Sequence, residues 1–180
     1  MAAELLDNYR AASEWTAAKV AGAEGKLDAQ TPCDDWTVEQ LLNHMVETQQ
    51  YFVRSAKGEQ DASPPSADPP DDLIGDHPAA AYAKGREQTI STFSEDGVIE
   101  RTGPSLGIAF SDTLLHGWDV AKATGQDTTM PDGLAAAAYA VVHGAFTDDQ
   151  RTGVFKPEVE VGDDASPQDK LLAYTGRHPG

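Results

Sequence analysis

The sequence predicts an all-α protein, a helical bundle built from long amphipathic segments. Apolar residues recur at intervals of three and four in segments near residues 3–24, 38–57, 78–96 and 110–125. This spacing is typical of helices that bury one face. Turn-forming Gly and Pro residues separate the segments. Because long amphipathic helices bury their apolar faces by packing side by side, we expect a bundle.

Length, charge and cysteine content limit the possible functions. The 180 residues fit one domain that can bury a core without a structural metal, so any metal would be functional. The net charge of −17 argues against nucleic acid or an anionic membrane as partner. Cys33 is the single cysteine, and neither a signal peptide nor a membrane-spanning run is evident. We expect a cytoplasmic protein, with monomer or homodimer left open.

The first half of the chain predicts two helices and a long loop. A stripe from Leu5 to Val20 predicts a helix over 3–24, ended by Gly25. Thr37, with Gln40 three residues later, has the pattern of a capping box that begins a helix over 38–57. Residues 58–76 are rich in Pro, Asp and Ser and predict an acidic loop. The loop either covers a site or is a plain linker.

The second half predicts three longer helices and a short one. Helical spacing covers 78–96, before Gly97, and a short extended segment follows at 98–101. A turn from Gly103 to Gly107 leads into the helix over 110–125. Pro131 begins a helix expected to reach about Thr147, and a last helix covers 167–175. We assign residues 1–150 to the bundle and 151–180 to a C-terminal extension packed on it in the same domain.

The helix over 110–125 carries the first candidate ligands. Asp112 and His116 are four residues apart, so they project from one face, and Asp119 falls on the same side. A carboxylate and an imidazole at this spacing form half of a metal site, and another helix must supply the rest. Two alternatives remain open: a solvated polar stripe, or a buried His116 bonded to Asp119 or to a backbone carbonyl.

The helix over 38–57 carries the candidate for the missing ligand. His44 lies at the flank of its apolar stripe, where a histidine is otherwise a satisfied core or boundary residue. If the two helices are neighbours, His44, Asp112 and His116 converge. His77 is interpreted as a surface residue, and His143 is a weaker ligand candidate than His44. Cys33 is interpreted as a half-buried connector residue, since no basic residue or histidine flanks it in sequence.

Two segments resemble a known family. TPCDDWTVEQLLNHMVE (31–47) and SDTLLHGWDVAKATG (111–125) are similar to the signature segments of the mycothiol-dependent maleylpyruvate isomerase metal-binding (N-terminal) domain, within the DinB/YfiT-like superfamily. The tail from Val154 is similar to that of a single-domain, actinobacterial-type subgroup described as metal-binding proteins. The resemblance implies a DinB/YfiT-like four-helix bundle with long crossover connections and a short C-terminal extension.

The resemblance also implies the ligands. The family's histidine in LLxH falls on His44, and its (E/D)xxxH pair falls on Asp112 and His116. Asp112 stands where the isomerase has Glu, which shortens the reach to a metal. The isomerase also has a second domain that contributes to substrate handling. This chain ends at Gly180, so we do not expect maleylpyruvate isomerisation itself. Asp119 is a candidate to orient His116 from behind the ligands.

Three functions follow as hypotheses. Two imidazoles and one carboxylate leave a coordination position open, which is the pattern of catalytic zinc, although Ni, Fe or Co would also be held. The family picture places a low-molecular-weight thiol, mycothiol, in that position. It implies an S-transferase or isomerase acting on a small electrophile, whose catalytic residues beyond the metal are unknown. The alternatives are a non-catalytic metal-dependent small-molecule binding or stress-response protein, and a bundle without metal.

Overall fold

The computed structural model describes residues 2–33, 36–145 and 156–179, and in these ranges the chain is all-helical. It forms the helices α1 (Ala2–Ala21), α2 (Val38–Ala56), α3 (Pro78–Phe93), α4 (Val98–Thr102), α5 (Ser105–Thr124), α6 (Leu134–Val142) and α7 (Pro167–Tyr174). The predicted all-α fold class is therefore confirmed.

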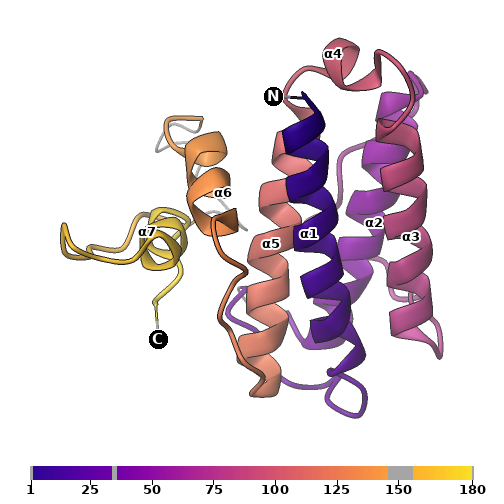
Figure 1. The fold of residues 1–180 in the computed structure, drawn as a ribbon. Helices are drawn as coiled ribbons and strands as arrows, with labels where there is room; N and C mark the ends of the chain where they lie inside the picture. Colours follow the sequence, from indigo (N-terminus) through magenta and orange to yellow (C-terminus); the bar gives the residue numbers. More distant parts are fainter. Residues whose placement is uncertain (1, 34–35, 146–155, 180) are drawn as a thin grey trace.

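The four long helices α1, α2, α3 and α5 form a bundle (Figure 1). α1 packs against α3 and α5, and α2 packs against the same two helices. α2 and α3 run parallel to each other, which requires the long connection between Ala56 and Pro78 to return along the bundle (Figure 1). α2 and α5 are therefore neighbours, as the convergence of His44 with Asp112 and His116 requires.

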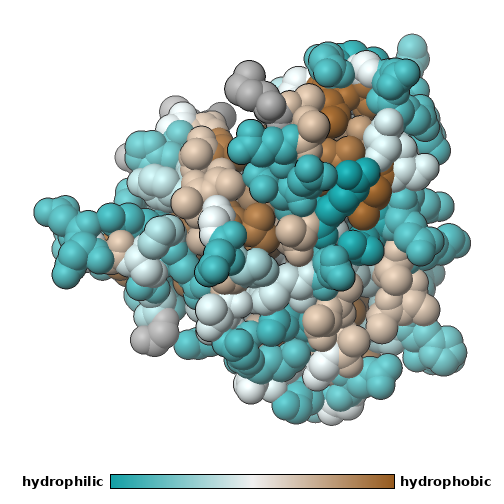
Figure 2. Space-filling model, viewed as in Figure 1, coloured by the Kyte–Doolittle hydropathy of each residue, from teal (hydrophilic) through white to brown (hydrophobic). Residues whose placement is uncertain are grey.

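The bundle core is apolar and the surface is hydrophilic. Tyr9, Phe93, Phe110 and Trp118 are among the largest fully buried side chains. Hydrophilic residues cover most of the face in view in Figure 2, as expected for a chain with 30 acidic residues. α5 lies deepest and is buried on several sides, because α1, α2 and α6 all pack on it. A polar side chain on α5 is consequently removed from water.

The capping box predicted at the start of α2 is confirmed. The Gln40 backbone N–H donates to Thr37 Oγ1, and the Thr37 backbone N–H donates to Gln40 Oε1 at 3.0 Å. The two bonds satisfy N–H groups that have no partner within the helix. They fix where α2 begins and thus where His44 lies along it.

Three boundary predictions are wrong. Residues 98–101 are not extended but belong to α4, because Gly97 turns the chain at φ 75° and Arg101 N–H bonds the Gly97 carbonyl at 3.1 Å. Gly107 lies inside α5 rather than in a turn. There the missing side chain leaves room for Val141 of α6, whose Cγ1 would lie 3.2 Å from an added Cβ.

The third correction concerns α6. It begins at Leu134, not Pro131, because Gly133 has a left-handed backbone conformation (φ 79°) that α-helical residues avoid. It ends at Val142, where His143 becomes extended. The predicted end at Thr147 lies outside the described residues.

The segments after α5 pack on the outside of the bundle. α6 packs on α5, and α7 packs on α6 (Figure 1). Tyr174 of α7 accepts a hydrogen bond from the Gly144 N–H at 2.8 Å, and Arg177 reaches α5. Among the helices that the structure describes, none combines the length and apolarity that crossing a bilayer requires.

Candidate metal centre

The candidate centre lies between α2 and α5. His44, two turns into α2, is 6% exposed, and its ring lies beside Trp36 and His116, with centroids 4.8 and 5.1 Å apart. The Thr48 hydroxyl lies 3.5 Å from His44 Nε2. His44 is thus held at the α5 side of its helix.

Asp112, His116 and Asp119 line one side of α5, as their spacing predicted. His116 and Asp119 are completely buried, and the Asp112 side chain is 18% exposed. The interpretation of these residues as a solvated polar stripe is therefore wrong. Asp112 is the one group in this row that water reaches, so a ligand would enter from its side.

His44, Asp112 and His116, which we call the ligand triad, come together as predicted. One potential ligand atom from each residue lies within 4.8 Å of those of the other two. His116 Nε2 is 3.3 Å from Asp112 Oδ1. His44 Nδ1 and His116 Nε2 are both buried without a hydrogen-bond partner. Buried polar atoms of this kind are uncommon and call for a partner, and the three residues have the spacing of a group that could hold a metal ion.

The electrostatics of the triad are strongly coupled. Burial, followed by the nearby His116, lowers the pKa of His44 to about 4, so this imidazole is neutral at pH 7. Burial also disfavours the charged form of His116, but the carboxylate of Asp112 outweighs it and raises the pKa of His116 well above 6.5. Positive charge is thus favoured at the point between Asp112 and the imidazoles.

The other ring nitrogen of His116 faces a buried carboxylate. His116 Nδ1 lies 3.1 Å from Asp119 Oδ2, so the predicted contact between these two residues is present. This arrangement agrees equally with a metal ligand, because metal-bound histidines commonly donate their second N–H to a carboxylate. Asp119 thus fixes the ring orientation of His116.

Arg177, which the sequence reasoning missed, completes the back of the site. Its Nε and one terminal nitrogen donate to the two oxygens of Asp119 at 2.8 and 2.7 Å, a bidentate pair. Burial opposes ionisation of Asp119, but Arg177 holds the pKa of this carboxyl well below its usual range. The residue lies just beyond α7, 58 positions from Asp119, so no local spacing could have indicated the pairing.

Cys33 is the second residue whose surroundings differ from the sequence interpretation. It is 5% exposed rather than half-buried. Its thiol donates to Asp119 Oδ2 at 3.0 Å, and Sγ lies 3.7 Å from His116 Nδ1 and 3.5 Å from Arg177. Burial, and then Asp119, raise the pKa of the Cys33 thiol. The thiol is therefore held protonated, as a hydrogen-bond donor.

Cys33, His116 and Asp119 form a second group with the spacing of metal ligands. Arg177, however, already places a guanidinium against both the carboxylate and the sulfur of this group. A second cation there would be repelled by a buried, permanently charged group. Of the two groups, the ligand triad is thus the better candidate for a metal site.

The remaining candidates lie elsewhere. His77 is exposed at the start of α3, as predicted. His143 packs between Tyr139 and Tyr174, with ring centroids 4.9 and 5.2 Å away. A cavity of about 10 Å³ adjoins Asp112, with Gln49 and Tyr82 also in its wall. That volume holds about one water molecule.

Comparison with known proteins identifies the family of the chain. Residues 9–121 match the family model described as the mycothiol maleylpyruvate isomerase N-terminal domain, a span that contains the whole triad. Two Mycobacterium tuberculosis proteins described as uncharacterized, from strains CDC 1551 and H37Rv, are each 30% identical over 96% of this chain and 97% of their own length. No solved structure matches. The chain belongs to the mycothiol maleylpyruvate isomerase N-terminal domain family.

Proposed function

We propose that the protein binds one divalent metal ion through His44, Asp112 and His116 and uses it in thiol-dependent transfer or isomerisation of a small electrophile. The observation that carries the proposal is the convergence of two imidazoles and a carboxylate from two helices, with His44 Nδ1 and His116 Nε2 buried and without a hydrogen bond. Membership of a mycothiol-related family supports the thiol as cosubstrate.

The donor set suits zinc and also Ni, Fe or Co. Imidazole nitrogen and carboxylate oxygen are common ligands of all four ions, and three protein ligands leave a position for a further ligand. A divalent cation with such a position lowers the pKa of a thiol that binds to it, so that the sulfur is nucleophilic at neutral pH. Mycothiol would be the thiol activated in this way.

The protein's own residues hold and orient the centre. Asp119 accepts from His116 Nδ1 and keeps Nε2 directed at the triad, while Arg177 compensates the Asp119 charge. The partly exposed Asp112 marks the side from which cosubstrates enter. The thiol loses its proton to solvent, and its sulfur forms a bond to the electrophilic carbon. The leaving group departs with its electron pair; in an isomerisation the thiol itself is later expelled.

A non-catalytic role is the competing function. The cavity beside Asp112 holds about one water molecule, which is too small for a thiol and an electrophile together and favours a role without turnover. In that case the same three ligands would be needed, but no thiol would be consumed.

The metal assignment is tested by elemental analysis of untagged protein. We expect about one ion per chain in the wild type and background levels in His44→Ala and in His116→Ala, because two ligands from the protein hold an ion poorly. His77→Ala is the matched control, since His77 is exposed and outside the site. Metal that persists in both triad variants would overturn the assignment.

The activity is tested on metal-loaded protein with mycothiol and a panel of small electrophiles. Transferase or isomerase chemistry predicts thiol-dependent product formation that disappears in His116→Ala. Product is measured by mass spectrometry, with thiol and metal each left out in turn. Full metal occupancy without turnover of any electrophile class would reject the enzyme and leave the binding role.

A further inference from the structure

A small polar cavity inside the bundle adjoins Asp112 of the ligand triad. Its wall includes Tyr9 of α1, Gln49 of α2, Tyr82 of α3 and Asp112 of α5. Gln49 is 4% exposed and Tyr82 is 2% exposed, so bulk water reaches neither side chain. Both amide atoms of Gln49 and the Tyr82 hydroxyl are buried without a hydrogen bond to any described residue. Such atoms are costly in a core, so their presence in one wall indicates a partner inside the cavity.

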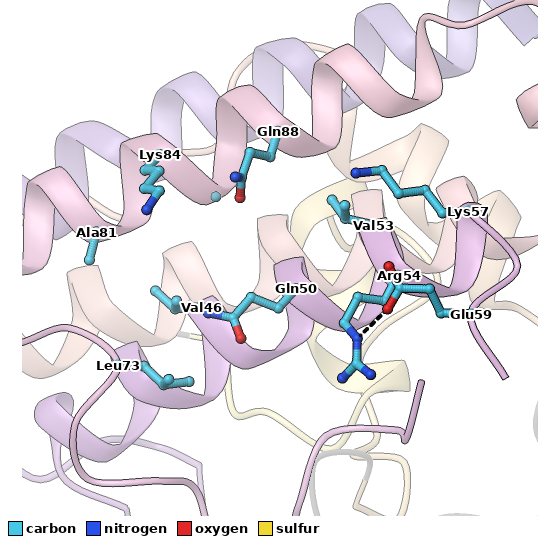
Figure 3. Close-up of a pocket in the computed structure, with 11 residues that line it drawn as sticks. Val46, Gln50, Val53, Arg54, Lys57, Glu59, Leu73, Ala81, Lys84 and Gln88 are labelled. Atoms are coloured by element: carbon cyan, nitrogen blue, oxygen red, sulfur yellow. Dashed lines mark hydrogen bonds and ion pairs between the residues drawn. The ribbon is translucent and has the colours of Figure 1, made fainter. Parts of the chain in front are cut away.

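The packing of α3 makes room for the Gln49 amide. Gly85 lies inside α3, although a glycine weakens a helix relative to alanine. A Cβ atom added at Gly85 would collide with Gln49 Oε1. Gln50 and Gln88 face the open groove of about 530 Å³ between α2 and α3 (Figure 3), whereas Gln49 lines the inner cavity. Gly85 therefore lets the Gln49 amide lie deep between the two helices, at the wall of the cavity.

The cavity has the size and the polar wall that one water molecule needs. Its volume is about 10 Å³, close to the smallest space that holds a water, and a buried water needs two to four polar partners. Gln49, Tyr82 and Asp112 offer an amide, a hydroxyl and a carboxylate. Burial chiefly, with a smaller contribution from the Asp112 charge, raises the pKa of Tyr82 well above 10, so its hydroxyl keeps a proton to donate. The Thr16 hydroxyl, close to Tyr82, donates elsewhere, to a backbone carbonyl of α5 at 3.0 Å.

Asp112 is the triad member that lacks a second polar contact to orient it. His116 has Asp119 behind it, and His44 has the Thr48 hydroxyl. Among the described residues, Asp112 makes one ion-pair contact, with His116 Nε2 at 3.3 Å. If Nε2 binds the ion, it can no longer donate to Asp112. Carboxylates that bind a metal are themselves hydrogen-bonded by groups behind them, so Asp112 then needs another donor.

We propose that Gln49 and Tyr82 are positioning residues of the metal centre, which hold Asp112 through one water molecule in this cavity. The water accepts from the Tyr82 hydroxyl and the Gln49 amide and donates to the Asp112 carboxylate. A bridging water is nearly as favourable as a direct hydrogen bond, and it links two side chains to a carboxylate that they do not bond directly. The inference rests on the metal-binding part of the proposed function and names residues outside the triad that set the metal affinity.

Zinc affinity, measured by competition with a chelator, tests the proposal in Tyr82→Phe and Gln49→Met. Each variant nearly keeps the shape of its side chain and loses the polar atoms. We expect the dissociation constant of each to be at least ~10-fold higher than that of the wild type. Tyr51→Phe and Gln50→Met are matched controls on α2 outside the cavity wall and should stay within about twofold of the wild type.

Two further measurements separate positioning from damage to the fold. Saturating zinc should restore full occupancy in both variants, because all three ligands remain. A crystal structure of the zinc-loaded wild type should show a water within hydrogen-bond distance of Gln49, Tyr82 and Asp112, and Tyr82→Phe should lose it or displace it.

Four results would contradict the proposal. Unchanged zinc affinity in either variant, or a crystal structure without this water, would overturn it and leave the metal site intact. Incomplete occupancy at saturating zinc would show that the substitution disrupts the triad, and would overturn a role limited to positioning. A wild type that binds neither zinc nor another divalent ion would overturn the proposed function, and this inference with it.

Discussion

At the scale of single residues, the contact between Asp119 and Arg177 joins the end of the described chain to its most buried helix. Both side chains are almost fully buried and are paired at 2.7 Å. A buried pair adds little net stability over an apolar pair of the same shape, but loss of one partner leaves an uncompensated charge in a medium of low polarity. Removal of one partner should therefore change the stability more than the intact pair contributes to it.

We predict that Asp119→Asn lowers the free energy of unfolding by about 3–5 kcal/mol, because Arg177 stays charged and buried. Urea denaturation measures the change. Asp132→Asn, at an exposed position, should change it by less than about 0.5 kcal/mol. The double variant Asp119→Asn/Arg177→Met should lose less free energy of unfolding than the sum of the losses in the two single variants. Additive losses would show that the two side chains are not coupled.

Tyr9 gives a prediction for alkaline pH. Burial raises the pKa of Tyr9 to about 12, so the folded protein holds this proton more tightly than the unfolded chain does. Stability from this group is therefore complete below pH 10 and is lost as the pH rises toward 12. Between pH 9 and pH 11 the loss should be about 1 kcal/mol smaller in Tyr9→Phe than in the wild type. Urea denaturation at each pH tests this; parallel pH curves for the two proteins would contradict it.

The site residues show what sequence can predict at this scale. The positions of Asp112, His116 and Asp119 could be predicted, because helical periodicity alone places them on one side of the helix. His44 followed once α2 and α5 were taken as neighbours. The role of Arg177 and the surroundings of Cys33 could not be predicted from the sequence, because their contacts depend on the path of the chain after α5. Cys33 illustrates this: its sequence neighbours are not basic, but its spatial neighbours include Arg177 and His116.

At the scale of elements, helix starts were predicted best where side chains bond the backbone locally. The capping box at Thr37 involves only residues three apart, so the sequence contains the whole interaction. Residues 98–101 were mispredicted because Val98 and Ile99 are β-branched and favour strands, whereas no strand exists among the described residues for them to pair with. Gly107 was misread as a turn because its role is to admit a neighbouring helix.

The cap gives a prediction at this scale. Thr37→Ala should lower the free energy of unfolding by about 0.5–2 kcal/mol, because the Gln40 N–H loses its acceptor. Thermal and urea denaturation measure the effect. Thr129→Ala, an exposed threonine that caps no helix, is the matched control and should stay within about 0.5 kcal/mol of the wild type. Equal stability of the two variants would show that the cap does not hold α2.

At the scale of the whole molecule, charge is the dominant feature. A net charge of −17 on 180 residues repels itself, and the repulsion is greater in the compact state than in the unfolded chain. Added salt screens charges that are farther apart than about 8–10 Å at physiological ionic strength. The bundle should therefore be least stable in dilute buffer.

We predict that the melting temperature rises between 10 mM and 300 mM NaCl. A gain of about 1 kcal/mol corresponds to about 2–4 °C for a chain of this size. Tetramethylammonium chloride should have the same effect if screening is the cause, whereas a response to one cation only would indicate a specific ion site. A melting temperature that is independent of salt, or that falls, would contradict the prediction.

The position of Arg177 also sets an order of events in the cell. Asp119 emerges from the ribosome long before Arg177, since α6, α7 and the intervening segments are synthesised between them. Until translation reaches the tail, Asp119 lacks the guanidinium that pairs with both of its oxygens. The buried ion pair behind His116 is consequently completed only in molecules whose synthesis has passed residue 177.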